Sequence, residues 1–101
     1  MHLRHLRAFV AVSDVLSFSR AADELDIAQP AVSQQIRALE EELGVLVFDR
    51  IGKRVSLTEA GRVLLPYARQ ILSLVEIAEN EVREQGELKR GRASLGAPPT
   101  V

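Results

Sequence analysis

The longest helical pattern in the chain is the feature that most constrains its fold. From Glu59 to about Gln85 the apolar residues follow helical spacing, and Thr58 just before them is a residue type that caps helix N-termini. A helix of this length spans roughly 40 Å at about 1.5 Å per residue. Its apolar residues recur in alternating steps of four and three, the spacing of a heptad seam: Leu64, Ala68, Ile71, Val75, Ala78 and Val82.

The remainder of the chain is too short to cover such a seam. The 101 residues have room for one small core, and the simplest partner is the same helix of a second copy, which predicts a symmetric homodimer. An amphipathic helix folded back on the head is the alternative, but Leu65, Leu72 and Leu74 widen the apolar surface beyond one face. Pro66 should kink the helix or loosen its first turns.

Glycine and proline predict where this helix ends. Gly86 is well placed as a C-cap, and the glycines and prolines that follow it indicate a hinge. The last apolar residues resemble the first strand of a further domain. We therefore expect a head in residues 1–57, a linker and dimerisation helix in 58–86, and in 87–101 a hinge with the start of a truncated C-terminal domain.

Composition excludes several functions. Without cysteine there is no disulfide framework, no zinc finger and no thiolate catalyst. No apolar run approaches the roughly 20 residues that cross a bilayer, and the start has no apolar signal region, so we expect a cytoplasmic protein without membrane contact. His2 and His5 are spaced like a metal pair on a helix, but no carboxylate or thiol follows nearby. We expect no metal, no cofactor and no enzyme.

The first half of the chain predicts two helices before a polar one. Helical spacing runs from Leu3 to Leu16. Ser17 then precedes a short apolar run and is a good N-cap, which predicts a second helix that ends near Asp26.

The stretch "AQPAVSQQIRALEEELG" predicts a third helix with Pro30 in its first turn and Gly44 at its end. Its apolar residues fall on one side, and the other side is polar, with Arg37 as the only ionised side chain between Ile27 and Leu39. Serine and glutamine can hydrogen-bond to base edges, and glutamine pairs with adenine. The acids come only at the end, Glu40 to Glu42, as expected if the first half approaches a polyanion. A merely solvated polar face is the alternative.

After Gly44 the apolar pattern alternates on both sides of Gly52, which predicts a β-hairpin with its tip at Ile51 to Lys53. Arg50, Lys53 and Arg54 place three cations at or near this tip, where they can reach a phosphate or a narrow minor groove. The net charge of −1 argues weakly against a nucleic-acid ligand, but the basic hairpin beside an uncharged helix face favours one. A solvated loop, or a protein whose main role is oligomerisation, is the alternative.

The predicted order of elements is mainly α: three helices, a hairpin wing and a long helix, or a winged helix-turn-helix with a dimerisation helix. Three stretches, "LRHLRAFVAV", "SFSRAADELDIAQPAVSQQIRALEEELGVLVFDR" and "GKRVSLTEAGRVLLPYARQIL", resemble the N-terminal DNA-binding domain of LysR-type transcriptional regulators. The resemblance runs from Leu3 to about Leu74, and the combination of "RAA", "QPAVSQQI", "LEEELG" and "LTEAG" is specific.

The resemblance implies a bacterial regulator that binds double-stranded DNA at an interrupted palindrome. It implies a homodimer through antiparallel long helices, a tetramer in the full-length protein, and a small-molecule effector held by the missing C-terminal domain. The family's base-contacting positions match Gln29, Pro30, Ser33 and Gln34, to which the residue pattern adds Arg37, and its wing contact matches Lys53 or Arg54. Positions that hold the DNA backbone match Ser17, Ser19, Arg20 and Arg50.

Two residues depart from the family pattern. Ala28 stands where serine or threonine is common, so the third helix lacks a good cap, at a cost on the order of 1 kcal/mol. Gln34 stands where arginine is common, which should shift preference toward adenine or weaken general affinity.

Overall fold

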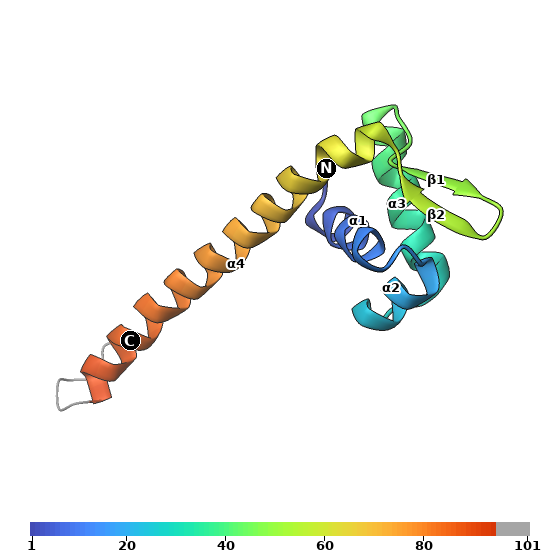
Figure 1. The fold of residues 1–101 in the computed structure, drawn as a ribbon. Coiled ribbons are helices and arrows are strands. Elements are labelled where there is room, and N and C mark those ends of the chain that lie inside the picture. Colours follow the sequence, from blue (N-terminus) through green and yellow to red (C-terminus); the bar gives the residue numbers. More distant parts are fainter. Residues whose placement is uncertain (95–101) are drawn as a thin grey trace.

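The computed structural model describes residues 1–94, and within them a helical head carries a hairpin and a long helix (Figure 1). The elements follow the predicted order: α1 (Leu3–Val15), α2 (Phe18–Leu25), α3 (Gln29–Leu43), β1 (Phe48–Ile51), β2 (Arg54–Leu57) and α4 (Glu59–Ser94). The molecule measures 65 × 25 × 19 Å because α4 extends far beyond the head.

Local chemistry sets the helix boundaries in the head. The Ser17 hydroxyl accepts a hydrogen bond from the Arg20 backbone N–H at 3.2 Å and caps α2. Gly44 ends α3 in the left-handed conformation, with φ at 71°. Ala28 precedes α3 and contributes no side-chain cap, as its methyl group requires. The predicted caps at Ser17 and Gly44 are confirmed.

The core lies where α1, α2 and α3 pack against one another. Its largest fully buried side chains come from α1, α3 and the segment before the hairpin: Phe9, Val12, Val32, Ile36, Leu39 and Val47. The predicted apolar face of α3 therefore faces the core, with one exception. Leu43, the last residue of α3, remains 38% exposed at the end of that face.

The hairpin closes through a two-residue turn, Gly52 and Lys53. β1 and β2 pair antiparallel with Ile51 opposite Arg54, and Gly52 has φ at 63°, the conformation that a tight hairpin turn requires of its first central residue. Phe48 is buried, and Val55 and Leu57 pack against the core. The wing is thus anchored by its apolar face.

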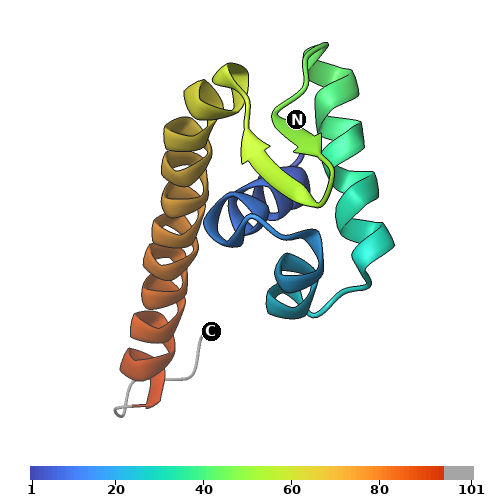
Figure 2. The ribbon, with the colours of Figure 1, turned by 45° about the vertical axis from the view of Figure 1, so that its right-hand side comes forward.

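Thr58 ties the start of α4 to the head. Its hydroxyl accepts from the Gly61 backbone N–H at 3.0 Å and donates to the Leu46 carbonyl at 2.7 Å. α4 then packs along α1, where Arg69 and Asp14 form an ion pair at 2.7 Å. Figures 1 and 2 both show the first turns of α4 bent relative to the rest, as the proline inside this helix predicts.

The predicted end of the long helix is wrong. α4 does not stop at Gly86 but continues to Ser94. A single glycine inside a helix costs about 1 kcal/mol, and the glutamate, leucine and lysine that follow Gly86 are good helix formers, so the helix continues through it. The predicted hinge after Gly86 is therefore helical as far as residue 94, and residues 95–101, where a strand was expected, lie outside the described part.

Candidate nucleic-acid interface

The outward face of α3 is polar and nearly free of charge. Gln29, Pro30, Gln34 and Arg37 are exposed, and Ser33 is half-buried beside them. The Gln29 Nε2 donates a hydrogen bond to the Ser33 Oγ at 3.1 Å. All five predicted recognition residues therefore lie together on the surface of one helix, with amide and hydroxyl groups available to a ligand.

The acids at the end of α3 have structural partners, which sequence reasoning missed. The Glu40 Oε2 accepts from the backbone N–H of Val47 at 2.9 Å and of Phe48 at 3.4 Å, so this carboxylate fixes the start of β1. Glu42 accepts from the Met1 ammonium at 2.6 Å, and this hydrogen bond lowers the pKa of Glu42. Two of the three acids thus contact neighbouring segments of the chain.

Arg50 on β1 is positioned by an aromatic contact. Its guanidinium carbon lies 4.1 Å from the centre of the Phe18 ring, a cation–π geometry. Phe18 begins α2 and packs edge-on against Phe48, with ring centres 6.0 Å apart. This contact brings Arg50 to the N-terminal turn of α2, which also carries Ser19 and Arg20.

The cations of the head are not neutralised by neighbouring acids. Within residues 1–89, whose side chains the structure describes, no ion pair involves any of five cations: Arg20, Arg37, Arg50, Lys53 and Arg54. All five are exposed. An open groove of about 420 Å³ runs between α3 and β1. It is lined by two cations, Arg37 and Arg50, and by two acids, Asp49 and Glu40, of which Glu40 is already bound to backbone N–H groups. The surface formed by α3 and the hairpin therefore offers free positive charge to an anion.

The predicted heptad seam is divided between two environments. Leu64 packs against the core and Ala68 is fully buried, so the head itself covers the start of the seam. Val75 is half-buried, and Ile71, Ala78 and Val82 are exposed. Other exposed apolar residues of α4 were not assigned to the seam: Val63, Tyr67, Leu74, Ile77 and Leu88. Helical spacing shows that two apolar stripes exist, but only the packing of α1 shows which one the head covers.

Among the described residues, no three His, Asp or Glu side chains gather in a group that could hold a metal ion. None of the helices in that part of the chain is long and apolar enough to cross a membrane.

The three packed helices followed by a two-stranded wing define a winged helix-turn-helix, and the predicted fold class is confirmed. The family model for bacterial regulatory helix-turn-helix proteins of the lysR family matches residues 3–62. The chain belongs to the LysR family.

Known proteins resemble the chain in sequence and in structure. It is 47% identical, over 94% of its length, to an uncharacterised helix-turn-helix transcriptional regulator of Azotobacter vinelandii, of which it covers 66%. It is 43% identical, over 98% of its length, to the RuBisCO operon transcriptional regulator of Allochromatium vinosum, of which it covers 33%. The crystal structure of the BenM DNA-binding domain with catB site 1 DNA matches 85% of this chain and 97% of that one, with a TM-score of 0.81 and 44% identity.

The chain thus spans about a third to two thirds of the length of these curated relatives. Both are transcriptional regulators rather than enzymes.

Proposed function

We propose that this chain binds double-stranded DNA sequence-specifically as a homodimer and is the DNA-binding part of a bacterial LysR-type transcriptional regulator. The observation that supports this proposal most directly is the exposed face of α3, which has no carboxylate before Glu40. It lies beside a hairpin whose cations make no ion pair with any acid among the described residues. The likeness to a DNA-binding domain solved with its DNA supports this proposal.

The first half of α3 enters the major groove, which is wide enough for one helix. Gln29, Ser33 and Gln34 hydrogen-bond to base edges, and Pro30 makes an apolar contact. Arg37 lies nearer the end of α3 and neutralises phosphate. Because Gln29 is held by Ser33 in the free protein, part of its side-chain entropy is already lost before binding.

The hairpin reaches the adjacent minor groove, and Lys53 or Arg54, at or near the hairpin tip, inserts into that groove. Ser17, Ser19, Arg20 and Arg50 hold the DNA backbone and fix the register of the complex without reading sequence. The stacking of Arg50 on Phe18 supports this role, because it fixes one cation at the start of α2.

The second copy covers the exposed apolar stripe of α4. Val82 of the seam, and Tyr67 and Leu74 outside it, are 71%, 62% and 64% exposed in the single chain, and large apolar side chains exposed along one helix mark an interaction site. Beyond Leu72, no described residue of α4 packs against the core. Two α4 helices that pair antiparallel place two heads on one duplex, so the operator is an interrupted palindrome.

In the full-length protein, tetramer formation and effector binding belong to a C-terminal domain. The full-length protein is cytoplasmic.

The test is the salt dependence of DNA affinity. Each phosphate contact contributes about 0.9 to the slope of log affinity against log salt. Arg37→Ala, Lys53→Ala and Arg54→Ala should each flatten the slope, whereas Arg83→Ala on the distal part of α4 should leave it unchanged. No affinity at low salt, or equal slopes in all four variants, would overturn the assigned surface. Nanomolar oligomerisation without DNA affinity would point to a protein-interaction role instead.

A further inference from the structure

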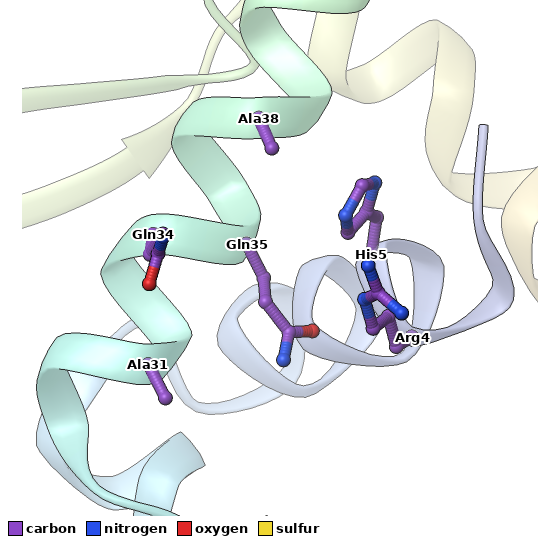
Figure 3. Close-up of a pocket in the computed structure, with 6 residues that line it drawn as sticks. All are labelled: Arg4, His5, Ala31, Gln34, Gln35 and Ala38. Atoms are coloured by element: carbon purple, nitrogen blue, oxygen red, sulfur yellow. The ribbon is translucent and has the colours of Figure 1, made fainter.

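A second hollow lies on the flank of α3 away from the hairpin (Figure 3). It has a volume of about 260 Å³ and lies between the first turn of α1 and the middle of α3. Two of its residues come from α1 and four from α3: Arg4, His5, Ala31, Gln34, Gln35 and Ala38. In Figure 3 the side chains of Arg4, His5 and Gln35 extend into the space between the two helices.

His5 is the unusual residue of this hollow. It is the only buried polar or charged side chain among the described residues, at 7% exposure, and its Nδ1 has no hydrogen-bond partner. A buried ring nitrogen without a partner destabilises the fold by about 1 to 3 kcal/mol. The Nδ1 is inaccessible in the free protein, so it gains a partner if the ring turns toward a ligand in the hollow.

The surroundings of His5 favour an anionic ligand. Arg4 is exposed and makes no ion pair within the described residues. The backbone N–H groups of Leu3 and Arg4, in the first turn of α1, make no hydrogen bond to another backbone group, as is usual at a helix N-terminus. The nearby carboxylate, Glu42, is already bound to the Met1 ammonium.

The hollow borders the proposed recognition face. Gln34 belongs to both, since it is exposed on the outward side of α3 and lines the hollow. A helix in the major groove has a phosphate backbone on each side. Arg37 and Arg50 line a groove on the hairpin side of α3, and Arg4 supplies the cation on the opposite side.

We propose that the hollow between α1 and α3 binds a backbone phosphate of the same DNA duplex, through Arg4, His5 and Gln35. This inference rests on the proposed function. The Arg4 guanidinium pairs with the phosphate, the Gln35 amide donates to it, and the His5 ring gains the partner that it lacks in the free protein. The head then clamps the DNA from both sides of α3.

The first test compares two cations of α1. Arg4→Gln and Arg7→Gln each remove one positive charge from an exposed position of α1, but only Arg4 lines the hollow. Arg4→Gln should lower the salt slope of DNA affinity by about 0.9, and Arg7→Gln should leave it near that of the wild type. Equal slopes for the two variants would overturn the phosphate site and leave the proposed function standing. Failure of the wild type to bind any duplex would instead overturn the proposed function.

The second test uses the proton on His5. A phosphate beside the ring favours its charged form, so DNA binding should take up a proton and tighten as the pH falls from about 7.5 to about 6. The other titratable or charged groups that influence His5 are His2, Arg4, Glu42 and the Met1 ammonium. His5→Asn should lose most of this pH dependence and His2→Asn should keep it, with thermal unfolding used to confirm that both fold. Identical pH profiles for the wild type and His5→Asn would overturn the role of His5.

Discussion

Apolar side chains are buried in the head but exposed on the distal half of α4. In the head, the largest apolar residues of α1 and α3 are fully buried within the same chain. On α4, Ala68 is fully buried against the head, whereas Leu74, less than two turns later, is 64% exposed. Figure 1 shows the reason: α4 extends away from the head. Apolar residues continue along this distal part of the helix, where the head cannot cover them. The head completes its core alone, and we propose that a second copy covers the distal part of α4.

The largest expected effect is the removal of a core ring from the head. Phe9→Ala empties a fully buried position that contacts Phe48, and such truncations cost about 3 to 5 kcal/mol. The head should lose most or all of its stability in urea unfolding. Tyr67→Ala on the exposed stripe should change the stability of the head by less than about 1 kcal/mol. Similar losses of head stability in the two variants would contradict the conclusion that the head is stabilised by its own core and not by the exposed side chains of α4.

The same substitution, glycine to alanine, can be made near the head and in the distal part of α4, at Gly61 and Gly86. A Cβ at Gly61 would lie 2.2 Å from the Val47 carbonyl oxygen and 2.7 Å from Leu57 Cδ2, so backbone must shift. Gly61→Ala should destabilise the head by about 3 kcal/mol. Gly86→Ala, in the distal part of the same helix, should stabilise α4 by up to about 1 kcal/mol. Thermal unfolding measures both, and a stable Gly61→Ala protein would contradict the close packing of α4 on the hairpin.

A charge on the exposed stripe should separate the two copies without unfolding the head. Leu74→Glu loses roughly 2 kcal/mol of apolar burial in each copy, which for the two copies together corresponds to about a 1,000-fold weaker dimer. Glu76→Gln, an exposed neighbour, is the control and should remain dimeric. Sedimentation equilibrium measures the constants. An unchanged dimer in Leu74→Glu would show that another surface joins the copies.

The smallest expected effect is the pH dependence of head stability. Burial, followed by the charges of His2 and Arg4, lowers the pKa of His5 from its ordinary value of 6.5. The unfolded chain therefore binds the proton more readily, and stability should fall as the pH drops below about 6.5. The lowered pKa of Glu42 adds a second loss at more acid pH, below about 4.5, where the unfolded carboxylate takes up its proton first. His5→Asn should remove the first loss only, as urea unfolding across this range can check.

Much of the fold follows from local chemistry. Ser17 and Thr58 begin helices through their hydroxyls, and Gly44 and Gly52 adopt positive φ where a chain reversal needs it. These signals act over a few residues, so they can be read from the sequence. The end of α4 could not, because one glycine is a weak signal against good helix formers on either side.

The finer structure of the site depends on contacts between distant segments. Arg50 stacks on Phe18, and Glu40 accepts hydrogen bonds from the backbone N–H groups of Val47 and Phe48. Both contacts join segments that are separate in the sequence. The burial of His5 beside α3 is likewise a tertiary effect. Sequence spacing shows only that His2 and His5 are three residues apart on one helix, and the packing of α1 on α3 is what reveals that His5 is buried.

If two copies of the head, joined by α4, read DNA together, the DNA that they select should contain two half-sites. The most direct test is to sequence what the wild-type chain and Leu74→Glu retain from a pool of randomised duplex DNA at physiological ionic strength. We expect an interrupted palindrome for the wild type, and a single half-site or markedly reduced retention for the variant. Enrichment of one unrepeated site by a wild-type dimer, or retention of no sequence at any salt concentration, would contradict it.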